Sequence, residues 1–457
     1  MIAKASYKTT SWRWGTINET GRYINGVAFK PTDWTSKGFP IIRIQNLTDP
    51  SKPLNRTTRK VDEIYKVERG DLLVSWSATL DAFIWDREPA LLNQHIFKVI
   101  PDESVVIKRF LFYLLRLAIA QMVKSEHLHG STMKHINRGP FLAHRVPVPT
   151  LDEQERIVAE IEKQFTRLDA GLASLKRVQI ALKRYRASVL KAACEGRLVP
   201  TEAELARKEN RSYETGEQLL HRILKERREK WNGKGKYKEP AAPQQPSDID
   251  LPEGWVWAGF EQLADAAKHA IKAGPFGSSL KKSVYTATGF KIYGQEQVIR
   301  GDPYFGDYFI SRELFKKLQS CEAKPGDILI SLVGTAGKVL ILPSDSAPGI
   351  INPRLLKLSL SRSGVNSKFI KIFLESSTAR TFFKLAAHGG TMEILNLGIL
   401  KALPVPLPPL NEQARVVAEV ERRLSLMEEL EETVATNMQR STRLRQGVLG
   451  TAFGRHS

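Results

Sequence analysis

The chain has 457 residues, 42% of them hydrophobic and 26% charged, which is typical of a globular protein of two to four domains. Lysine and arginine outnumber aspartate and glutamate by 69 to 49, and the formal net charge of +20 favours a polyanionic partner, most often nucleic acid. Two cysteines exclude a disulfide framework or zinc cluster built from this chain alone, and no apolar run is long enough to span a bilayer, so we expect a cytoplasmic protein without a membrane segment.

Residues 1–150 alternate short strand-like runs with turns and then enter a helical run. The strand-like runs are Ile41–Gln45, Asp71–Trp76 and Ile96–Ile100. The apolar stretch Lys108–Lys124 predicts a buried amphipathic helix. This part of the chain therefore predicts an α+β domain.

A proline-rich entry, VPVPT at residues 146–150, leads into a long predicted helix. Asp152 is the expected N-cap, with Glu155 at the capping-box position. Beyond Ile161 the apolar residues follow the spacing of a coiled-coil seam. They are Phe165, Leu168, Leu172, Leu175, Leu182 and Val189. The alternative is an amphipathic helix that packs only on its own domain.

Residues 199–250 differ in composition from the segments on either side. Leu219–Trp231 predicts a charged helix that either grips DNA phosphates or is solvated, and Glu226 and Glu229 among its cations favour the solvated alternative. The following GKGKYKEPAAPQQPSD predicts a flexible linker.

The remainder of the chain repeats the first part. VPLPPLNEQARVVAEVE at 405–421 matches VPVPTLDEQERIVAEIE at 146–162 in 11 of 17 positions, at an offset of 259 residues. The same offset relates Asn93 to Asn352, and it falls to 256, 251 and 243 towards the start of the repeat. A repeat of this length predicts two copies of one fold, with insertions confined to the first half of the module.

The second copy follows the same order of elements. It has strand-like runs at Ile328–Leu332 and Val339–Leu342, a helical run at Ser367–Ala386, and a second long helix with Asn411 as the expected N-cap. The second seam comprises Val420, Leu424, Met427, Val434, Met438 and Val448. The predicted domains are 1–150 and 251–409, with spacer helices at 151–198 and 410–457 and a charged helical segment and linker at 199–250. The predicted fold class is α+β, with two similar globular domains separated by a pair of long antiparallel coiled-coil helices.

Helices of this length have a consequence for the expected ligand. Roughly 40 helical residues extend about 60 Å, which exceeds one turn of duplex DNA at about 3.4 Å per base pair. Two similar domains held that far apart fit a split DNA site with an unread spacer.

Catalytic and metal-binding motifs are not evident in the sequence. The segment Val333–Val339 resembles a phosphate-binding loop, but Leu332 and Val339 stand where Walker A requires glycine and a hydroxyl residue. Four histidines between residues 127 and 144 cluster without a nearby cysteine or an HExxH pattern. We therefore expect no catalytic residue and no metal site.

Several of these motifs together resemble the specificity subunit of type I restriction–modification systems. They are the paired LxEQxRxVAE helix entries, the GDxLxS strand at 70–75 and 326–331, and the helix ends AACEGRL and TAFGR. The resemblance spans nearly the whole chain, although Thr150 stands where the second copy has Pro409. In that family each globular module is a target recognition domain for one half of a bipartite, asymmetric sequence in double-stranded DNA.

The resemblance also implies partners and a division of labour. The helices of the family form the spacer and dock two methyltransferase (M) subunits, which methylate adenine, and two restriction (R) subunits complete the complex. This chain would be no catalyst and would bind no cofactor, with S-adenosylmethionine, ATP and Mg expected on the partner subunits. Two other functions stay open: a self-contained DNA-modifying enzyme, and a coiled-coil scaffold without a DNA role.

Residues that contact DNA are expected on exposed loops, where polar side chains reach base edges and cations reach phosphates. In the first domain the candidates are Arg43, Gln45, Asn46, Ser75, Ser77, Thr79, His129, Ser131, Thr132 and Lys134, with Lys52, Arg56, Arg59 and Lys60 for phosphates. In the second they are Gln295, Gln297, Arg300, Gly334, Thr335, Lys338, His388 and Thr391, with Lys281 and Lys282 for phosphates. The alternative for each is an ordinary polar surface residue. Asn93 and Asn352 are shared by both copies, so we expect structural roles for them.

Overall fold

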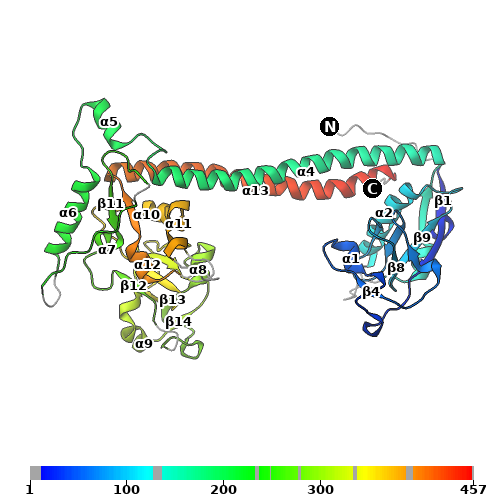
Figure 1. The fold of residues 1–457 in the computed structure, drawn as a ribbon, viewed down its shortest axis with the longest axis horizontal. Helices are drawn as coiled ribbons and strands as arrows, with labels where there is room; N and C mark the ends of the chain where they lie inside the picture. The colour runs from blue at the N-terminus through cyan, green and yellow to red at the C-terminus, as the bar shows by residue number, and fades with distance from the viewer. Residues whose placement is uncertain are drawn as a thin grey trace. The chain divides into compact units, whose positions relative to one another are not determined.

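The computed structural model describes residues 12–126, 136–231, 236–246, 249–275, 279–332, 337–386 and 395–454 (Figure 1). The chain divides into two compact units: unit 1 comprises Met1–Arg177 and Val434–Ser457, and unit 2 comprises Val178–Thr433. Within the described ranges, no helix combines the length and apolar character needed to cross a membrane.

Unit 1 contains two four-stranded sheets and one two-stranded sheet. Its strands are β1 (Arg13–Thr16), β2 (Gly21–Asn25), β3 (Phe39–Ile42), β4 (Asn55–Thr57), β5 (Lys66–Val67), β6 (Leu72–Ser75), β7 (Asp81–Ile84), β8 (Ala90–Leu92), β9 (Ile96–Pro101) and β10 (Arg145–Val148). The four-stranded sheets have the orders β2-β9-β6-β7 and β4-β3-β8-β5, and β1 pairs with β10. Only β3 and β8 pair in parallel among these named strands.

Unit 2 repeats this topology strand for strand. Its strands are β11 (Val256–Gly259), β12 (Ile271–Ala273), β13 (Phe290–Tyr293), β14 (Phe309–Ile310), β15 (Glu322–Ala323), β16 (Ile328–Ser331), β17 (Val339–Ile341), β18 (Gly349–Ile351), β19 (Leu355–Leu358) and β20 (Pro404–Leu407). The orders are β12-β19-β16-β17 and β14-β13-β18-β15, with β11 paired to β20. Again β13 and β18, the counterparts of β3 and β8, run parallel. The α+β repeat predicted from the sequence is therefore present in the fold.

Helices complete each unit. Unit 1 has α1 (Ile44–Thr48), α2 (Lys108–Glu126) and α3 (Arg138–Ala143). Unit 2 has α5 (Glu202–Glu209), α6 (Gly216–Glu229), α7 (Phe260–Leu263), α8 (Gln295–Arg300), α9 (Arg312–Lys317), α10 (Ser367–Glu375), α11 (Ser377–Ala386) and α12 (Leu397–Ala402). Short 3₁₀ turns lie at Ile17–Thr20, Pro31–Asp33, Glu63–Tyr65, Lys282–Val284 and Gln319–Cys321. Two long helices, α4 (Leu151–Cys194) and α13 (Leu410–Ala452), contribute residues to both units.

Local departures from the predicted elements have clear physical causes. The helical run predicted at Ser367–Ala386 is interrupted because Ser376 adopts an extended conformation and its hydroxyl accepts a hydrogen bond from the Ala379 N–H (3.2 Å), as an N-cap does. The two long helices begin at Leu151 and Leu410, one residue before the expected N-cap residues Asp152 and Asn411. Asp152 and Asn411 therefore lie in the first helical turn rather than at the N-cap.

A buried glutamine fixes the start of each long helix to its own unit. The Gln154 side chain accepts a hydrogen bond from the Ile107 N–H (2.9 Å) and donates to the carbonyls of Val105 and Pro149 (both 2.9 Å). Its relative exposure is 0%. These bonds satisfy backbone groups in the loop before α2, so this glutamine joins three segments of unit 1.

Gln413 repeats this arrangement in unit 2. It accepts from the Asn366 N–H (2.8 Å) and donates to the carbonyls of Gly364 (3.3 Å) and Pro408 (3.0 Å). Every partner lies 259 residues after its counterpart in unit 1. The glutamine of the LxEQ motif is therefore a structural clamp.

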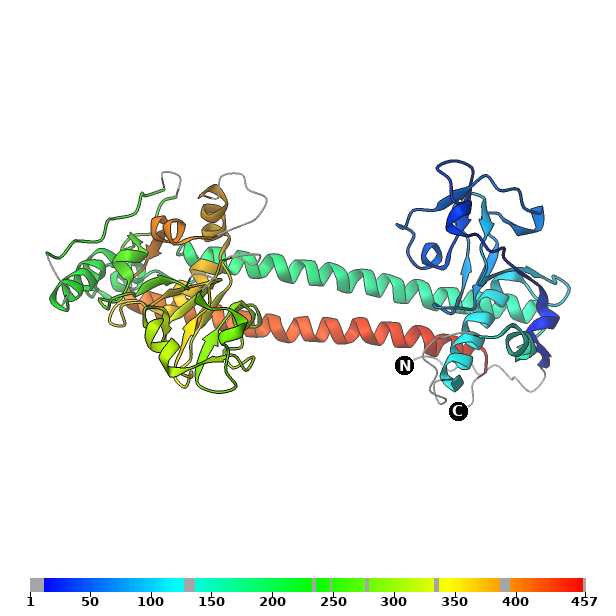
Figure 2. The same cartoon turned by 90° about the horizontal axis from the view of Figure 1, so that it is seen from below.

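Within each unit, segments of α4 and α13 lie side by side in both views (Figure 1 and Figure 2). In unit 1, Arg445 donates to Asp169 (2.8 Å) and its guanidinium lies 4.8 Å from the Phe165 ring centroid. In unit 2, Arg423 donates to the Tyr185 hydroxyl (3.5 Å). The predicted seam residues Phe165, Leu182, Val189, Met427 and Val434 are buried, which agrees with a coiled-coil seam rather than with helices that pack only on their own domains.

The C-terminal end of each long helix completes the core of one unit. In unit 1, Leu449, Ala452 and Phe453 of the α13 end pack in the main core, where Phe453 lies 5.2 Å from the Phe110 ring. In unit 2 the corresponding residues Leu190, Ala193 and Cys194 of α4 pack in the main core. Each core is thus closed by the helix that follows the other copy in the sequence.

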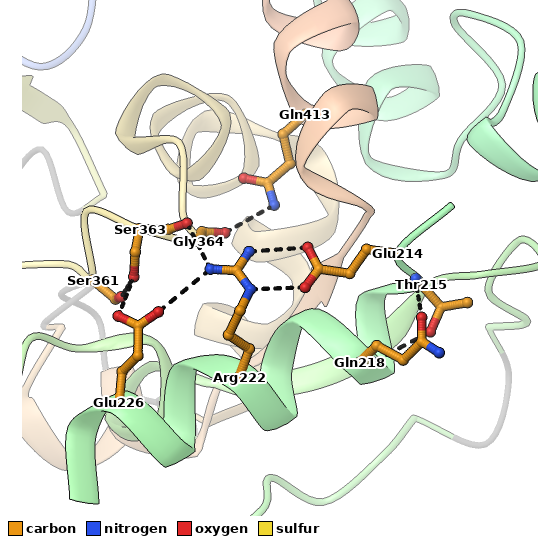
Figure 3. A network of polar contacts seen from close by, with 9 residues as sticks. All are labelled: Glu214, Thr215, Gln218, Arg222, Glu226, Ser361, Ser363, Gly364 and Gln413. Atoms are coloured by element: carbon orange, nitrogen blue, oxygen red, sulfur yellow. Dashed lines mark hydrogen bonds and ion pairs between the residues drawn. The ribbon is translucent and has the colours of Figure 1, made fainter. Parts of the chain in front are cut away.

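Helix α6 is amphipathic rather than solvated on all sides. Leu219, Leu220 and Ile223 are buried in the unit 2 core, which corrects the prediction for Leu219–Trp231. On its polar side, Arg222 donates to Glu214 through Nε (2.7 Å) and Nη2 (2.9 Å) and to the Ser363 carbonyl (3.1 Å) (Figure 3). This network attaches α6 to the loop before α10, the loop that Gln413 also holds.

Candidate nucleic-acid interface

The segments that follow β3 and β13 are short helices, although exposed loops were predicted there. The strand-like run predicted at Ile41–Gln45 ends at Ile42, because α1 begins at Ile44. The third residue of each helix, Asn46 in α1 and Gln297 in α8, accepts a hydrogen bond from the backbone N–H that precedes the helix (3.1 and 2.9 Å). Asn46 also donates to the carbonyls of Lys52 and Pro53 (3.2 and 3.1 Å), and Gln297 donates to that of Phe305 (2.9 Å). Both side chains are buried. These two base-contact candidates therefore hold the backbone instead of facing solvent.

Strands β6 and β16 occupy equivalent positions in the sheets of the two units. Ser75, the last residue of β6, is buried and donates to the Ser77 carbonyl (3.1 Å), so it is not a surface contact either. In unit 2, Gln295 at the start of α8 donates to Ser331 at the end of β16 (2.9 Å). The structure thereby brings the α8 start and the end of β16 together.

Several other candidates do reach the surface. Gln45 and Thr79 are exposed, and Ser77 is half-buried. Ala78, between the last two, has a φ of 59° in the left-handed region, which turns the chain sharply after β6. Gln45 and the Ser77–Thr79 turn therefore remain candidates for contacts with bases.

Lysines supply cations that carry no ion pair in the described part of the chain. Lys52, Lys60, Lys281, Lys282 and Lys338 are exposed. By contrast, Arg56 pairs with Glu88 (2.9 Å) and Arg59 with Asp33 (3.4 Å). An unpaired cation can meet a phosphate without losing an internal partner, so the lysines are better phosphate candidates than these two arginines.

Two further arginines rest on aromatic rings. The Arg43 guanidinium lies 5.2 Å from the ring centroid of Trp34, which is itself exposed. Arg300 lies 4.0 Å from the Phe305 ring. Exposed aromatic rings beside cations suit contacts with nucleotides. The sequence prediction omitted Trp34, although its position among Lys30, Lys37 and Arg43 was a usable signal.

Eight of the predicted contact residues lie outside the residues that the structure describes. They are His129, Ser131, Thr132, Lys134, Gly334, Thr335, His388 and Thr391.

The chemistry of the described residues does not point to a reactive centre. No group of three or more His, Cys, Asp or Glu side chains could hold a metal ion in the ranges that the structure covers. Burial raises the pKa of Cys194 to about 12, which keeps its thiol protonated and unreactive at neutral pH. The expected structural roles of the shared asparagines agree with their contacts: Asn93 accepts from the Phe29 N–H (3.5 Å) and Asn352 from the Arg354 N–H (2.9 Å).

Comparisons with known proteins all point to the same family. The family model described as the type I restriction modification DNA specificity domain matches residues 11–180 and 275–435. The chain is 25% identical over 446 residues to the EcoBI specificity subunit of Escherichia coli, covering 97% of this chain and 85% of that one. It is 21% identical to the MjaVIII specificity subunit of Methanocaldococcus jannaschii, covering 88% and 83% of the two chains. A chain from a solved type I R-M system shares the fold, with a TM-score of 0.59 at 19% identity and 97% coverage of both chains.

Proposed function

This chain belongs to the type I restriction–modification DNA specificity family, and we propose that its two repeats, at 1–150 and 251–409, each read one half of a bipartite, asymmetric DNA target. The proposal is supported by a contrast between buried residues, which are equivalent in the two repeats, and neighbouring surface residues, which differ. Asn46 and Gln297 occupy equivalent positions and keep the same amide hydrogen bonds. The surface residues beside them differ, since Arg43 and Gln45 of the first repeat correspond to Gly294 and Glu296 of the second.

In this proposal the chain selects the site and other subunits carry out the chemistry. It docks two M subunits and two R subunits, which bind S-adenosylmethionine, ATP and Mg, and the long helices set the unread spacer. The paired segments of α4 and α13 and the two clamped helix starts support such a frame, because they fix the helices rigidly to each unit.

The deciding experiment compares the purified chain with and without M subunits, using DNA and S-adenosylmethionine. We expect no methyl transfer by the chain alone, and methylation of a two-part sequence once M subunits are added. Methylation-aware sequencing identifies that sequence. Methyl transfer by the chain alone, or a contiguous target without a spacer, would overturn the proposal.

A point change tests the assignment of one repeat to one half-site. In the complex with M subunits, Gln45→Ala should relax base preference at positions in one half of the target and leave the other half unchanged, with a loss of discrimination of about 1–3 kcal/mol at the affected position. Equal relaxation in both halves would contradict the assignment.

The phosphate contacts of the second repeat predict a change in salt dependence. The double variant Lys281→Ala/Lys282→Ala should lower the slope of log K against log salt concentration by about 1.8, because each lost phosphate contact removes about 0.9. The measurement is a fluorescence anisotropy titration at several salt concentrations. A matched control is Arg228→Ala/Lys230→Ala, which removes the same charge from residues already paired with Glu239 and Glu226. A slope equal to that of the control would exclude these two lysines as phosphate contacts.

A further inference from the structure

Three side chains of unit 2 hold the start of helix α5, and we call Trp255, Glu412 and Arg415 the α5 socket. Glu412 accepts hydrogen bonds from the Glu202 N–H (2.8 Å) and from the Trp255 indole N–H (2.9 Å). Arg415 donates to the Glu202 carboxylate (2.5 Å). The socket therefore recognises a free N–H at a helix N-terminus together with a carboxylate on the first helical residue.

The carboxylates of the filled socket are shielded from solvent. Glu412 and Glu202 are both buried. Burial raises the pKa of Glu412. Burial also acts to raise the pKa of Glu202, but hydrogen bonds from Arg415 and Arg211 outweigh it, so the net shift is downward. Glu202 is thus held as a carboxylate between two guanidinium groups.

Unit 1 carries the same three residue types at the corresponding positions: Trp12, Glu153 and Arg156. Trp12 directly precedes β1, as Trp255 precedes β11, and the two strands pair with β10 and β20 in the same register. Glu153 and Arg156 follow the first residue of α4 by the same steps as Glu412 and Arg415 follow that of α13. Because the glutamine clamp between them is also repeated, we call these three residues the open socket.

The open socket has no occupant among the described residues. Trp12 is 8% exposed, yet its indole nitrogen has no hydrogen-bond partner within the described part of the chain, and an unsatisfied buried donor is unfavourable. Glu153 is half-buried and Arg156 exposed, and within the described ranges neither side chain forms a hydrogen bond or an ion pair.

The surface beside the open socket limits which segments can bind there. In unit 2, Gly364 lies against α6, where a Cβ atom would fall 2.6 Å from Ile223. The corresponding residue in unit 1 is Val105. A copy of α6 therefore does not fit beside the open socket in the same way, and an occupant needs to reproduce only the contact made by α5.

We propose that the open socket docks the N-terminus of a helix from an M subunit, one whose first turn carries a glutamate or aspartate. This rests on the proposed function, which requires M subunits on the repeated frame. Arg156 pairs with the carboxylate, and Glu153 accepts the free helix N–H and the Trp12 N–H. Unit 2 offers no equivalent vacancy because α5 fills its socket, so the two repeats contact their M subunits differently.

Affinity measurements on the full chain test this docking. Arg156→Ala should weaken binding of one M subunit by about 30-fold or more, since truncation of one member of a desolvated charge pair has effects of that size. Trp12→Phe, which removes the N–H together with part of the indole ring, should weaken it less. Arg167→Ala, an exposed arginine further along α4, is the matched control and should bind as wild type. Isothermal titration calorimetry gives both affinity and stoichiometry.

A photo-crosslinking residue at each socket gives an independent readout. At position 156 it should attach to the M subunit, whereas at position 415 it should attach to residues 201–211 of the same chain. Attachment of position 156 to residues 1–11, to residues 455–457 or to a second copy of this chain would overturn the docking. If M subunits bind wild type and Arg156→Ala equally, the docking fails and the proposed function stands. If they do not bind the wild type, the proposed function itself fails.

Discussion

Gln413→Ala is expected to lower the free energy of unfolding of unit 2 by about 3 kcal/mol, because it leaves buried backbone groups without partners. The groups concerned are the Asn366 N–H and the carbonyls of Gly364 and Pro408. Gln154→Ala should have a similar effect on unit 1 through the Ile107 N–H. Hydrogen exchange at Asn366 and Ile107 should report the loss in the affected unit only.

The control for this prediction is a glutamine that makes no such bonds. Gln439 lies on α13 and is exposed, so Gln439→Ala should change stability by less than about 0.5 kcal/mol. A second variant, Gln413→Glu, keeps an acceptor for Asn366 but places a buried carboxylate oxygen against the carbonyls of Gly364 and Pro408, and should destabilise unit 2 at least as much as Gln413→Ala. If Gln413→Ala behaves like Gln439→Ala, the clamp does not hold the helix start.

Arg415→Ala is expected to weaken the attachment of helix α5 to unit 2. It removes one of the two guanidinium groups that neutralise the buried Glu202 carboxylate, and breaking a buried ion pair costs several kcal/mol. Since Arg211 remains, we expect about 2 kcal/mol, which corresponds to roughly 30-fold faster hydrogen exchange in α5. Arg156→Ala is the matched control in the free chain, because the side chain of this corresponding arginine has no partner among the residues of unit 1 that the structure describes. Equal exchange in both variants would contradict the role assigned to Arg415.

The same contact predicts a dependence on pH. The pKa of Glu202 lies below its ordinary value of 4.5 in the folded protein, so the contribution of this carboxylate is present above pH 4.5 and is lost as the pH falls through the folded pKa. The pKa of Glu412 is raised above its ordinary value of 4.5. Glu412 therefore titrates at a higher pH than the range in which the Glu202 contribution is lost. The difference in α5 protection between wild type and Arg415→Ala should therefore shrink below pH 4.5. A constant difference would argue against ionised Glu202.

The long helices and the repeat were predictable because their signals are periodic and local. The LxEQ motif also indicated a shared structural frame, but the sequence did not show how its glutamine holds that frame. The partners of Gln154 include the Val105 carbonyl and the Ile107 N–H, almost fifty residues away in the sequence. A long-range hydrogen bond of this kind leaves no spacing pattern, so only the fold reveals it.

The candidate contact residues were less predictable, for a related reason. A polar residue after a strand can face DNA or can satisfy the backbone at a helix start, and Asn46 and Gln297 do the latter. In helix α6 the many charged residues favour a solvated helix, whereas the spacing of Leu219, Leu220 and Ile223 marks one buried face.

The closure of the unit 1 core by the end of α13 has a consequence for biosynthesis. Translation produces Phe110 about 340 residues before Phe453, the residue that packs against it. A nascent chain therefore carries an uncovered apolar surface in its first domain until the ribosome reaches the last helical turn. A premature stop codon near the end of the gene would harm the domain that was synthesised first.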